Sequence, residues 1–296
     1  MNRRHFVQTT VAAAALAAVT PALAAEAKAK RTNKRGIMWA TVGIKGSILD
    51  KMKAVKEAGF DGVEMMSHLN QEEVLKAREA VGLEILSVCG EKHWGKPLSS
   101  PDAAVREEGL AALKQTLRDA KAYGTNSILL VPGTVNAKVN FDDCWKISIE
   151  EIRKAIPLAQ ELGVKISIEN VWNNFIEKPE QAVRYLEEIN SPWVGWHFDC
   201  GNVIRFGDPI AWIKALGPRI NRVHLKEYSL DRSMRAGDVW KGFNAPLLEG
   251  ANNWAGIMKA LDAADYTGPV ITEQGGGSSP EGLKNLLESV NKILAS

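Results

Sequence analysis

The sequence predicts a (β/α)8 barrel, and three observations lead to this fold class. Between Gly36 and the end of the 296-residue chain, eight short apolar runs alternate with amphipathic stretches. The runs are continuously apolar, which is typical of parallel strands covered by helices. Eight strand–helix pairs is the number that closes such a barrel. A doubly wound open sheet would show the same alternation, but no Gly-rich phosphate loop follows the first run, which disfavours a dinucleotide-binding fold.

The eight predicted strands are short and apolar. In chain order they are GIMWA (36–40), GVEMM (62–66), LEILSV (83–88), SILLV (127–131), KISIE (165–169), WVGWHFD (193–199), INRVHL (220–225) and PVITE (269–273). Each is followed by a stretch with helical periodicity, so the two kinds of element alternate to the end of the chain.

The amphipathic stretches predict helices that cover the strands. Examples are ILDKMKAVKEAG (48–59), AAVREEGLAALKQTLRDAKAYG (103–124), CWKISIEEIRKAIPLAQELG (144–163), PEQAVRYLEEI (179–189) and WAGIMKALDAADY (254–266). Several of them end in glycine, as a helix C-terminus often does. We expect a single barrel domain over residues 36–296.

The first 24 residues carry the pattern of an export signal. Arg3 and Arg4 precede Phe6, a short and weakly apolar segment follows, and residues 22–24 (ALA) form a small-x-small cleavage site. Paired arginines at this place are typical of the twin-arginine route. We therefore expect a periplasmic protein, with residues 25–35 (AEAKAKRTNKR) as a solvated linker.

Composition indicates a globular protein and disfavours both a membrane-spanning segment and a nucleic-acid partner. The chain has 45% hydrophobic and 24% charged residues, and no apolar run reaches the roughly 18 residues that span a bilayer. Removal of residues 1–24 takes two of the 37 basic residues and no acid, so 35 basic and 35 acidic residues remain. A neutral chain makes a poor nucleic-acid-binding surface. Three cysteines are too few for a disulfide framework in a chain of this size.

Four side chains that can bind a metal stand at the ends of consecutive predicted strands. Three strands end in Glu169, Asp199 and Glu273, and His224 lies near the end of the strand between the last two. Catalytic groups of such barrels lie at the C-terminal strand ends, so these four share one level. Each acid alone would also fit a helix cap or an ion pair, but four coincident positions indicate one site.

This group of residues predicts a single bound divalent cation. Three carboxylates buried together would repel one another, and their pKa values would rise unless a cation lay among them. Carboxylates with one imidazole suit a hard or borderline ion. Mn²⁺ is the first choice, with Co²⁺, Mg²⁺ and Zn²⁺ as alternatives. A structural zinc site would more often use cysteines, and this set has none.

Four motifs in this order resemble the sugar isomerase/epimerase branch of the xylose isomerase-like barrel superfamily. They are ISIENVWNNF (166–175), WHFDCGN (196–202), RVHLKEY (222–228) and ITEQ (271–274). Further similarity lies in HWGKPLSSPDAAVREEGL (93–110) and LLEGANNW (247–254). The resemblance covers nearly the whole chain beyond residue 35.

The resemblance implies both the ligands and the chemistry of the site. It implies Glu169, Asp199, His224 and Glu273 as ligands of one divalent metal. It also implies that Glu169 and Glu273 are the acid/base pair, one removing the proton beside a ketone and the other returning it to the opposite face through an enediolate intermediate. A cation that polarises the carbonyl contributes several kcal/mol, and each positioned carboxylate contributes roughly 10²–10⁴-fold.

Two positions depart from the pattern of the free-ketose epimerases that the chain resembles. Those enzymes carry a histidine three residues after the metal-binding aspartate, where this chain has Asn202. They carry an arginine six residues after the metal-binding histidine, where this chain has Leu230, with Arg232 nearby. Together with the export signal, this predicts an unphosphorylated sugar or keto-sugar derivative as substrate. A 3-keto-glycoside would allow either isomerisation or β-elimination by the same enolisation.

Other residues are expected to reach the substrate from the strand ends and the loops that follow them. We predict substrate contacts for Trp39, Glu64, His93, Trp172, Asn202, Lys226 and Arg232. Lys226 lies two residues after His224 and so on the same side of its strand, where it could neutralise an enolate oxygen or pair with an acid. For the aromatic residues, packing at the barrel rim is the alternative.

Two rival functions are disfavoured by the residues present. A phosphodiesterase of the apurinic endonuclease type shares this barrel but uses a histidine-rich multi-zinc cluster, and only four histidines lie beyond residue 24. An exported sugar-binding protein without catalysis would be expected to lack one of the two glutamates, and both are present. The sequence predicts a metal-dependent sugar isomerase or epimerase, with a lyase or hydrolase acting on 3-keto-glycosides as the alternative.

Overall fold

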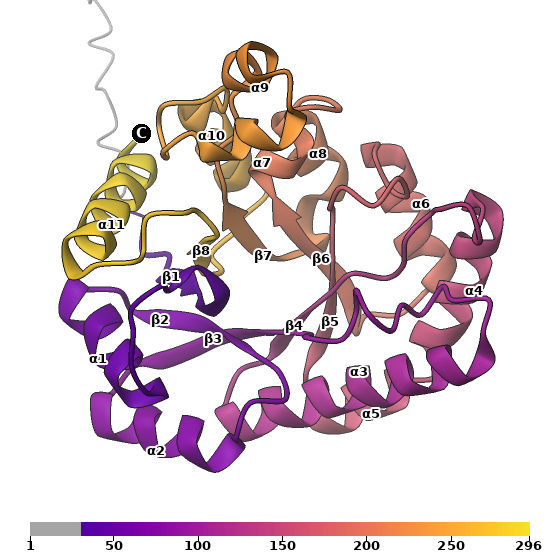
Figure 1. Ribbon diagram of the computed structural model, residues 1–296. Helices are drawn as coiled ribbons and strands as arrows, with labels where there is room; N and C mark the ends of the chain where they lie inside the picture. Colours follow the sequence, from indigo (N-terminus) through magenta and orange to yellow (C-terminus); the bar gives the residue numbers. More distant parts are fainter. Residues whose placement is uncertain (1–30) are drawn as a thin grey trace, which may run out of the picture. The chain divides into compact units, whose positions relative to one another are not determined.

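Eight parallel strands close into a barrel, and helices form a layer around it (Figure 1). The computed structural model describes residues 31–296. Each strand pairs with its neighbours in sequence, and β1 pairs with β8, which closes the ring. The predicted fold class is therefore confirmed.

The strands lie where the apolar runs predicted them, with ends that differ by at most two residues. They are β1 (Arg35–Met38), β2 (Gly62–Met66), β3 (Glu84–Cys89), β4 (Ser127–Leu130), β5 (Lys165–Glu169), β6 (Val194–Asp199), β7 (Ile220–Leu225) and β8 (Val270–Thr272). The largest difference is at β1, where the last two residues of the predicted strand begin a 3-10 helix, η1 (Trp39–Thr41).

Eleven α-helices follow or connect the strands of the described chain. They are α1 (Ile48–Ala58), α2 (Gln71–Val81), α3 (Ala103–Tyr123), α4 (Phe141–Arg153), α5 (Ile156–Leu162), α6 (Pro179–Ile189), α7 (Cys200–Val203), α8 (Pro209–Leu216), α9 (Leu230–Ala236), α10 (Trp254–Ala263) and α11 (Pro280–Ala295). Two more 3-10 segments are η2 (Gly217–Arg219) and η3 (Val239–Asn244).

One predicted helix is divided in two. The stretch 144–163 was expected to be continuous, but α4 ends at Arg153 and α5 begins at Ile156. Pro157 is the reason, because proline has no N–H for an intrahelical bond and is tolerated only in the first turn of a helix. The expected glycine at the far end is present, with Gly163 in the left-handed conformation at φ 67°.

The interior of the barrel divides into an apolar side and a polar side. Six buried residues from β1, β3, β4, β8 and the residue after β4 form an apolar cluster that is separate from the main core: Met38, Leu86, Cys89, Leu129, Val131 and Ile271. The main core fills the layer between strands and helices. The buried charged residues and histidines of the strands lie instead on β2 and on β5 to β7, and this asymmetry places the site described below.

The residues just before β1 contact the barrel. Arg31 donates to the carbonyl oxygens of Leu294 and Ser296 at 2.6 and 2.8 Å, and Asn33 donates to Gly268 O at 2.7 Å. The end of the predicted linker is thus packed against the domain. The predicted export signal and residues 25–30 lie outside the described residues. No described helix is long and apolar enough to cross a membrane.

Candidate active site

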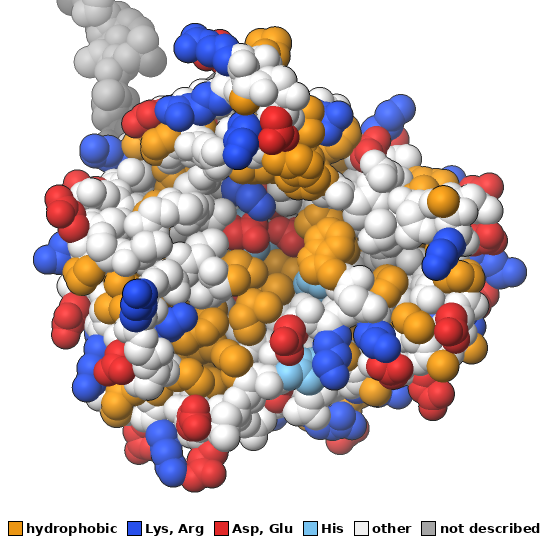
Figure 2. Space-filling view, viewed as in Figure 1, with side chains coloured by type: hydrophobic (Ala, Val, Ile, Leu, Met, Phe, Trp, Pro, Cys, Tyr) orange, Lys and Arg blue, Asp and Glu red, His pale blue; other side chains and the backbone are white. Residues whose placement is uncertain are grey.

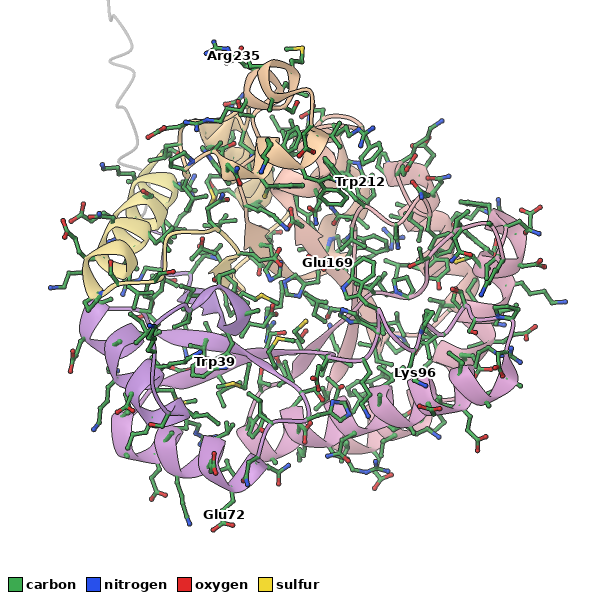
Figure 3. The ribbon with its side chains drawn as sticks, in the orientation of Figure 1. Trp39, Glu72, Lys96, Glu169, Trp212 and Arg235 are labelled. Atoms are coloured by element: carbon green, nitrogen blue, oxygen red, sulfur yellow. The ribbon has the colours of Figure 1, made fainter. Side chains whose placement is uncertain are left out.

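The four predicted metal ligands converge at the C-terminal ends of β5 to β8. Glu169 is the last residue of β5, Asp199 is the last residue of β6, His224 lies on β7 and Glu273 directly follows β8. One donor atom from each lies within 4.8 Å of the donor atoms of the other three. Figure 3 shows Glu169 near the centre of the ring of strands. The convergence that was expected from the strand ends is present.

Strand register explains why these side chains meet. Asp199 is the register partner of His224 across β6 and β7, and partners in neighbouring parallel strands point to the same face. His224 is in turn the partner of Ile271, an interior residue, so Glu273 two positions later also points inward. The sequence spacing and the pairing together bring these donors to one level.

The imidazole of His224 lies among the carboxylates. Its Nδ1 atom is 3.1 Å from Glu169 Oε1, 3.3 Å from Glu273 Oε2 and 3.7 Å from Asp199 Oδ2. His224 and Asp199 have no solvent exposure, and Glu169 is 7% exposed. Three acids are thus held around a single nitrogen atom with very little water to screen them.

One carboxylate oxygen of Asp199 is held by a backbone N–H group, and the other accepts no hydrogen bond from the described part of the chain. Its Oδ1 atom accepts from Asn202 N at 2.7 Å, which caps α7. Asn170 holds the end of β6, because its Oδ1 accepts from Asp199 N and its Nδ2 donates to Asp199 O. Asp199 Oδ2 is buried without a hydrogen-bond partner among residues 31–296. A buried carboxylate oxygen without a partner is costly unless a cation or proton satisfies it.

The protonation of the site is strongly perturbed. Burial raises the pKa of the Glu169 carboxyl to about 8, and the charge of Glu273 adds to this rise. Burial alone would also raise the pKa of Glu273, but the charges of Lys226 and His224 outweigh it and hold that pKa well below its usual range. The Glu64 and Glu273 carboxylates raise the pKa of His224 well above its usual range, although burial opposes them.

This donor set fits a divalent cation. Three carboxylates and one imidazole are the ligands that a hard or borderline ion prefers. Asp199 Oδ2 has no hydrogen bond within the described residues and the three acids repel one another, and a positive ion relieves both. Glu169, Asp199, His224 and Glu273 would hold it.

Lys226 contributes a positive charge at the same site. Its Nζ donates to Glu273 Oε2 at 2.8 Å and lies 3.7 Å from Asp199 Oδ2. The side chain is largely buried, and the acids raise its pKa above the usual value against the effect of burial. Of the two roles predicted for Lys226, pairing with an acid is the one that the structure contains.

An aromatic wall stands beside the carboxylates, and we use this term for Trp172, Tyr228, Trp240 and Phe243. The ring of Trp172 lies 4.8 Å from Phe243, 4.9 Å from Trp240 and 5.3 Å from Tyr228. Lys226 Nζ lies 4.9 Å from the centre of the Phe243 ring, which joins the wall to the acids. Figure 2 shows this face hollowed, with acidic side chains in its depth and apolar side chains around them.

Three of the four rings of the wall lie on the long excursion between β7 and α10, which contains α9 and η3 (Figure 1), whereas Trp172 lies in the segment between β5 and α6. Glu227 holds this excursion in place. Its buried carboxylate accepts from the backbone N–H groups of Leu248 and Asn252 and from Trp254 Nε1. No residue pattern around Glu227 signals this role, because these donors lie 21 to 27 residues downstream.

The other predicted substrate contacts lie in different surroundings. Trp39 is buried in the main core. His93 is half-buried, and its Nδ1 accepts from Val131 N at 3.3 Å. Asn202 donates from its side chain to Asn170 O. Arg232 forms an exposed ion pair with Glu249 at 3.3 Å.

Glu64 and His197 both lie next to His224 inside the barrel. Both are fully buried, and Glu64 Oε1 accepts from His224 Nε2 at 2.8 Å. Glu64 was predicted to contact substrate, but its carboxylate is directed to the ligand group and is not exposed at the mouth. A donor atom from each of Glu64, His197 and His224 forms a second close group.

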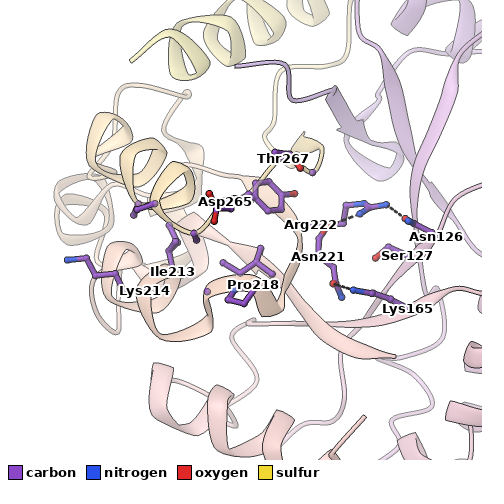
Figure 4. Close-up of a pocket in the computed structure, with 17 residues that line it drawn as sticks. Asn126, Ser127, Lys165, Ile213, Lys214, Pro218, Asn221, Arg222, Asp265 and Thr267 are labelled. Atoms are coloured by element: carbon purple, nitrogen blue, oxygen red, sulfur yellow. Dashed lines mark hydrogen bonds between the residues drawn. The ribbon is translucent and has the colours of Figure 1, made fainter. Parts of the chain in front are cut away.

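A pocket lies at the opposite end of the barrel. This open pocket of about 590 Å³ is lined by residues at the N-terminal ends of strands, among them Ser127, Lys165 and Ile220 (Figure 4). Arg222 reaches its wall and donates to Asn126 Oδ1 at 2.7 Å. This end of a barrel contributes to stability, whereas the chemistry lies at the C-terminal strand ends.

Comparison with known proteins gives one family and several relatives. A family model described as xylose isomerase-like TIM barrel matches residues 52–293. L-ribulose-5-phosphate 3-epimerase UlaE of Escherichia coli (strain K12) is 25% identical over 239 residues, which cover 76% of this chain and 81% of that protein.

Solved structures with the same fold include two sugar epimerases. A 3-keto-D-glucoside 4-epimerase of E. coli aligns with a TM-score of 0.74 at 19% identity, over 89% of this chain and all of that chain. A D-psicose 3-epimerase, solved in the presence of D-fructose, aligns with a TM-score of 0.72 at 20% identity over the same shares.

Proposed function

The chain belongs to the xylose isomerase-like TIM barrel family, and from this premise we propose that it is a divalent-metal-dependent sugar epimerase or isomerase. The observation that carries the proposal is the pair of carboxylates at one imidazole nitrogen. Glu169 reaches His224 Nδ1 from β5 and Glu273 reaches it from β8. Two acids that approach one point from strands separated by β6 and β7 can serve two faces of a small substrate.

In the proposed reaction, the two glutamates exchange protons with the carbon beside a ketone. One carboxylate removes the proton from one face, and the other returns a proton to the opposite face, which inverts that carbon. A bound divalent cation would polarise the ketone and balance the charge that develops on its oxygen. Lys226 adds a second positive charge on the side of Glu273. The aromatic wall borders the site and limits the access of water.

For the substrate, we propose an unphosphorylated keto-sugar derivative with a group beyond the reacting ring. The aromatic wall supports this, because Trp240 is 59% exposed and its ring lies 4.9 Å from that of Trp172. Exposed aromatic faces beside a polar site suit sugar rings, whose C–H faces are apolar. Arg232, which lies near the position of the family's arginine, is already paired with Glu249.

Two alternatives follow from the same site. One relative is named for a ketose phosphate, so a ketose phosphate is the alternative substrate. A glycoside whose leaving group stands on the carbon β to the ketone would instead lose that group after proton removal from the α carbon: the enolate electrons form a Cα–Cβ double bond, the C–O bond breaks, and the departing oxygen takes up a proton. The enzyme would then act as a lyase. We also propose action in the periplasm, which rests on Arg3, Arg4 and the cleavage site at residues 22–24, and cell fractionation tests it.

A substrate panel tests the proposal. The purified chain with Mn²⁺ is incubated with free ketoses, 3-keto-glycosides and ketose phosphates, and products are identified by NMR. The proposal expects turnover of a non-phosphorylated member, with inversion beside the ketone. Faster turnover of a ketose phosphate would overturn the substrate class, and release of a free aglycone would show elimination.

A further inference from the structure

A buried carboxylate lies behind the metal-binding histidine. Glu64 on β2 has no solvent exposure, and its Oε1 accepts from His224 Nε2 at 2.8 Å. In the ring of strands, β8 and β1 lie between β2 and β7. The contact therefore crosses the interior of the barrel and joins residues that are 160 positions apart.

The two nitrogen atoms of His224 face different partners. Nδ1 faces the three carboxylates of the ligand group, at 3.1 to 3.7 Å, and Nε2 faces Glu64 alone. A histidine can bind a metal through Nδ1 only when that atom offers a lone pair. In a neutral ring, this requires the proton to be on Nε2.

We propose that Glu64 is a positioning residue that holds the Nε2 proton of His224 and so keeps Nδ1 directed at the cation. Metal-bound histidines generally donate their second ring N–H to a carboxylate, a carbonyl or water, which fixes the ring and makes it a better ligand. The inference rests on the proposed metal site, but it is independent of the sugar that the enzyme acts on.

The same residues also suggest a competing arrangement, a second cation held by Glu64, His197 and His224. Their donor atoms do lie within 4.8 Å of one another. However, His224 would then have to give up both ring protons and bridge two ions. His197 Nδ1 lies 3.7 Å from Glu64 Oε2, beyond hydrogen-bond range, so His224 is the partner that Glu64 holds at bonding distance. The two arrangements differ in metal stoichiometry and in the protonation of His224.

The first test observes the His224 ring directly. The full chain with ¹⁵N-labelled histidine is loaded with Zn²⁺, which is diamagnetic, and long-range ¹H–¹⁵N correlation spectra are recorded. His68→Gln and His93→Gln variants help to assign the signals. The proposal expects a proton on Nε2 and none on Nδ1, with one zinc per chain. A proton on Nδ1, a ring without either proton, or two zinc ions per chain would overturn it.

The second test measures metal affinity by calorimetric titration with Mn²⁺. Glu64→Gln keeps the size of the side chain but removes its charge, and we expect binding to weaken roughly 10–100-fold. Asp119→Asn is the matched control, because Asp119 is also a buried acid, 2% exposed, whose Oδ2 accepts from Ser67 Oγ outside the ligand group. An equal loss in both variants, or an unchanged affinity in a folded Glu64→Gln chain, would overturn the proposal.

These readouts separate the inference from the proposed function. If the chain turned over no sugar of the panel, metal affinity and the His224 tautomer would still report on Glu64. If Glu64→Gln did not fold, the spectrum of the unaltered chain would still decide. Epimerase activity with the opposite tautomer would leave the proposed function standing and remove the role of Glu64.

Discussion

The ammonium group of Lys226 lies 2.8 Å from Oε2 of Glu273. The same nitrogen is 3.7 Å from Asp199 Oδ2, so one protein cation is in contact with two of the four proposed metal ligands. Lys226 and a bound metal ion would therefore interact with the same carboxylates, and their positive charges would repel one another. The contact also places a proton donor next to the place where substrate charge would develop.

Replacement of Lys226 by methionine is expected to strengthen metal binding and weaken catalysis. Two like charges a few ångströms apart repel by several kcal/mol even at an effective dielectric constant of about 20, so we expect Mn²⁺ to bind at least roughly tenfold more tightly. Calorimetric titration measures this. Lys241→Met, which removes a charge on exposed η3, is the control and is expected to change little. Weaker Mn²⁺ binding in Lys226→Met would contradict the repulsion.

Replacement of either glutamate is expected to slow epimerisation, but each replacement should block a different proton-transfer step. Glu169→Gln and Glu273→Gln should each reduce epimerisation by about 10²-fold or more, since each loses one positioned proton-transfer group. Reactions in D₂O with a substrate and with its epimer show which face each glutamate serves. One variant should retain exchange with the substrate and the other with the epimer. Full epimerisation by either variant would exclude that glutamate from the acid/base pair.

Metal binding is expected to stabilise the folded chain through Asp199. At a Mn²⁺ concentration of about 100 times Kd, binding contributes about 2.7 kcal/mol, which for a chain of this size corresponds to a rise in Tm of roughly 5–10 °C. A chelator should abolish the rise, and Asp199→Asn should show little of it. Differential scanning fluorimetry measures these shifts. A metal-induced rise of equal size in Asp199→Asn would remove Asp199 from the ligand set.

Loss of the exposed aromatic ring of Trp240 is expected to affect large substrates selectively. Trp240→Ala should raise KM for a keto-glycoside by roughly 2- to 12-fold, the equivalent of one aromatic contact of about 0.5–1.5 kcal/mol. Turnover of a free ketose should be unaffected, because a free ketose has no second group beyond the reacting sugar to pack on Trp240. Met234→Ala, on the same excursion and 74% exposed, is the matched control. Equal effects on both substrates would contradict a subsite at the wall.

One ion pair at the base of the barrel is expected to give pH-dependent stability. Arg35 holds Asp61 with Nε and Nη2 at 2.8 and 2.9 Å. Burial would raise the pKa of Asp61, but these bonds outweigh it and lower that pKa. A lowered folded pKa stabilises above the unfolded value of about 3.9, and this stability is lost as the pH falls through the folded value.

Urea unfolding of Asp61→Asn measures this contribution. Because the pair is about one-third exposed, solvent screening limits the expected loss to about 1 kcal/mol at neutral pH. The difference from the unaltered chain should shrink at about pH 3. Asp231→Asn, which breaks a more exposed pair with Arg235, should cost less. A difference that grows at low pH would contradict the assignment.

Much of the fold and the ligand group could be predicted from local sequence. Continuous apolar runs located every strand to within two residues, and the acids at the ends of β5, β6 and β8 located the site. These features are readable because burial and strand alternation act on neighbouring residues. The break between α4 and α5 was also local, at Pro157, but the helical periodicity on both sides obscured it.

Contacts between distant segments could not be predicted in the same way. The bond from His224 to Glu64 depends on the closure of the ring, and no pattern around Glu64 announces it. Trp39 and Trp240 are both tryptophans near strand or loop ends, yet one is buried in the core and the other is exposed on the excursion. The position of Trp240 depends on how the β7–α10 excursion folds, and Glu227 holds that excursion through contacts with residues 21 to 27 positions downstream.

Metal-dependent deuterium exchange is the decisive measurement for enolisation at the four-ligand site. One preparation of the purified chain is analysed for metal content and then incubated in D₂O with the sugar panel, first with Mn²⁺ and then with a chelator. We expect one divalent ion per chain, and deuterium uptake beside the carbonyl of a sugar only when metal is present. Absence of stoichiometric metal, or exchange that the chelator leaves unchanged, would contradict the four-ligand site and the enolisation that depends on it.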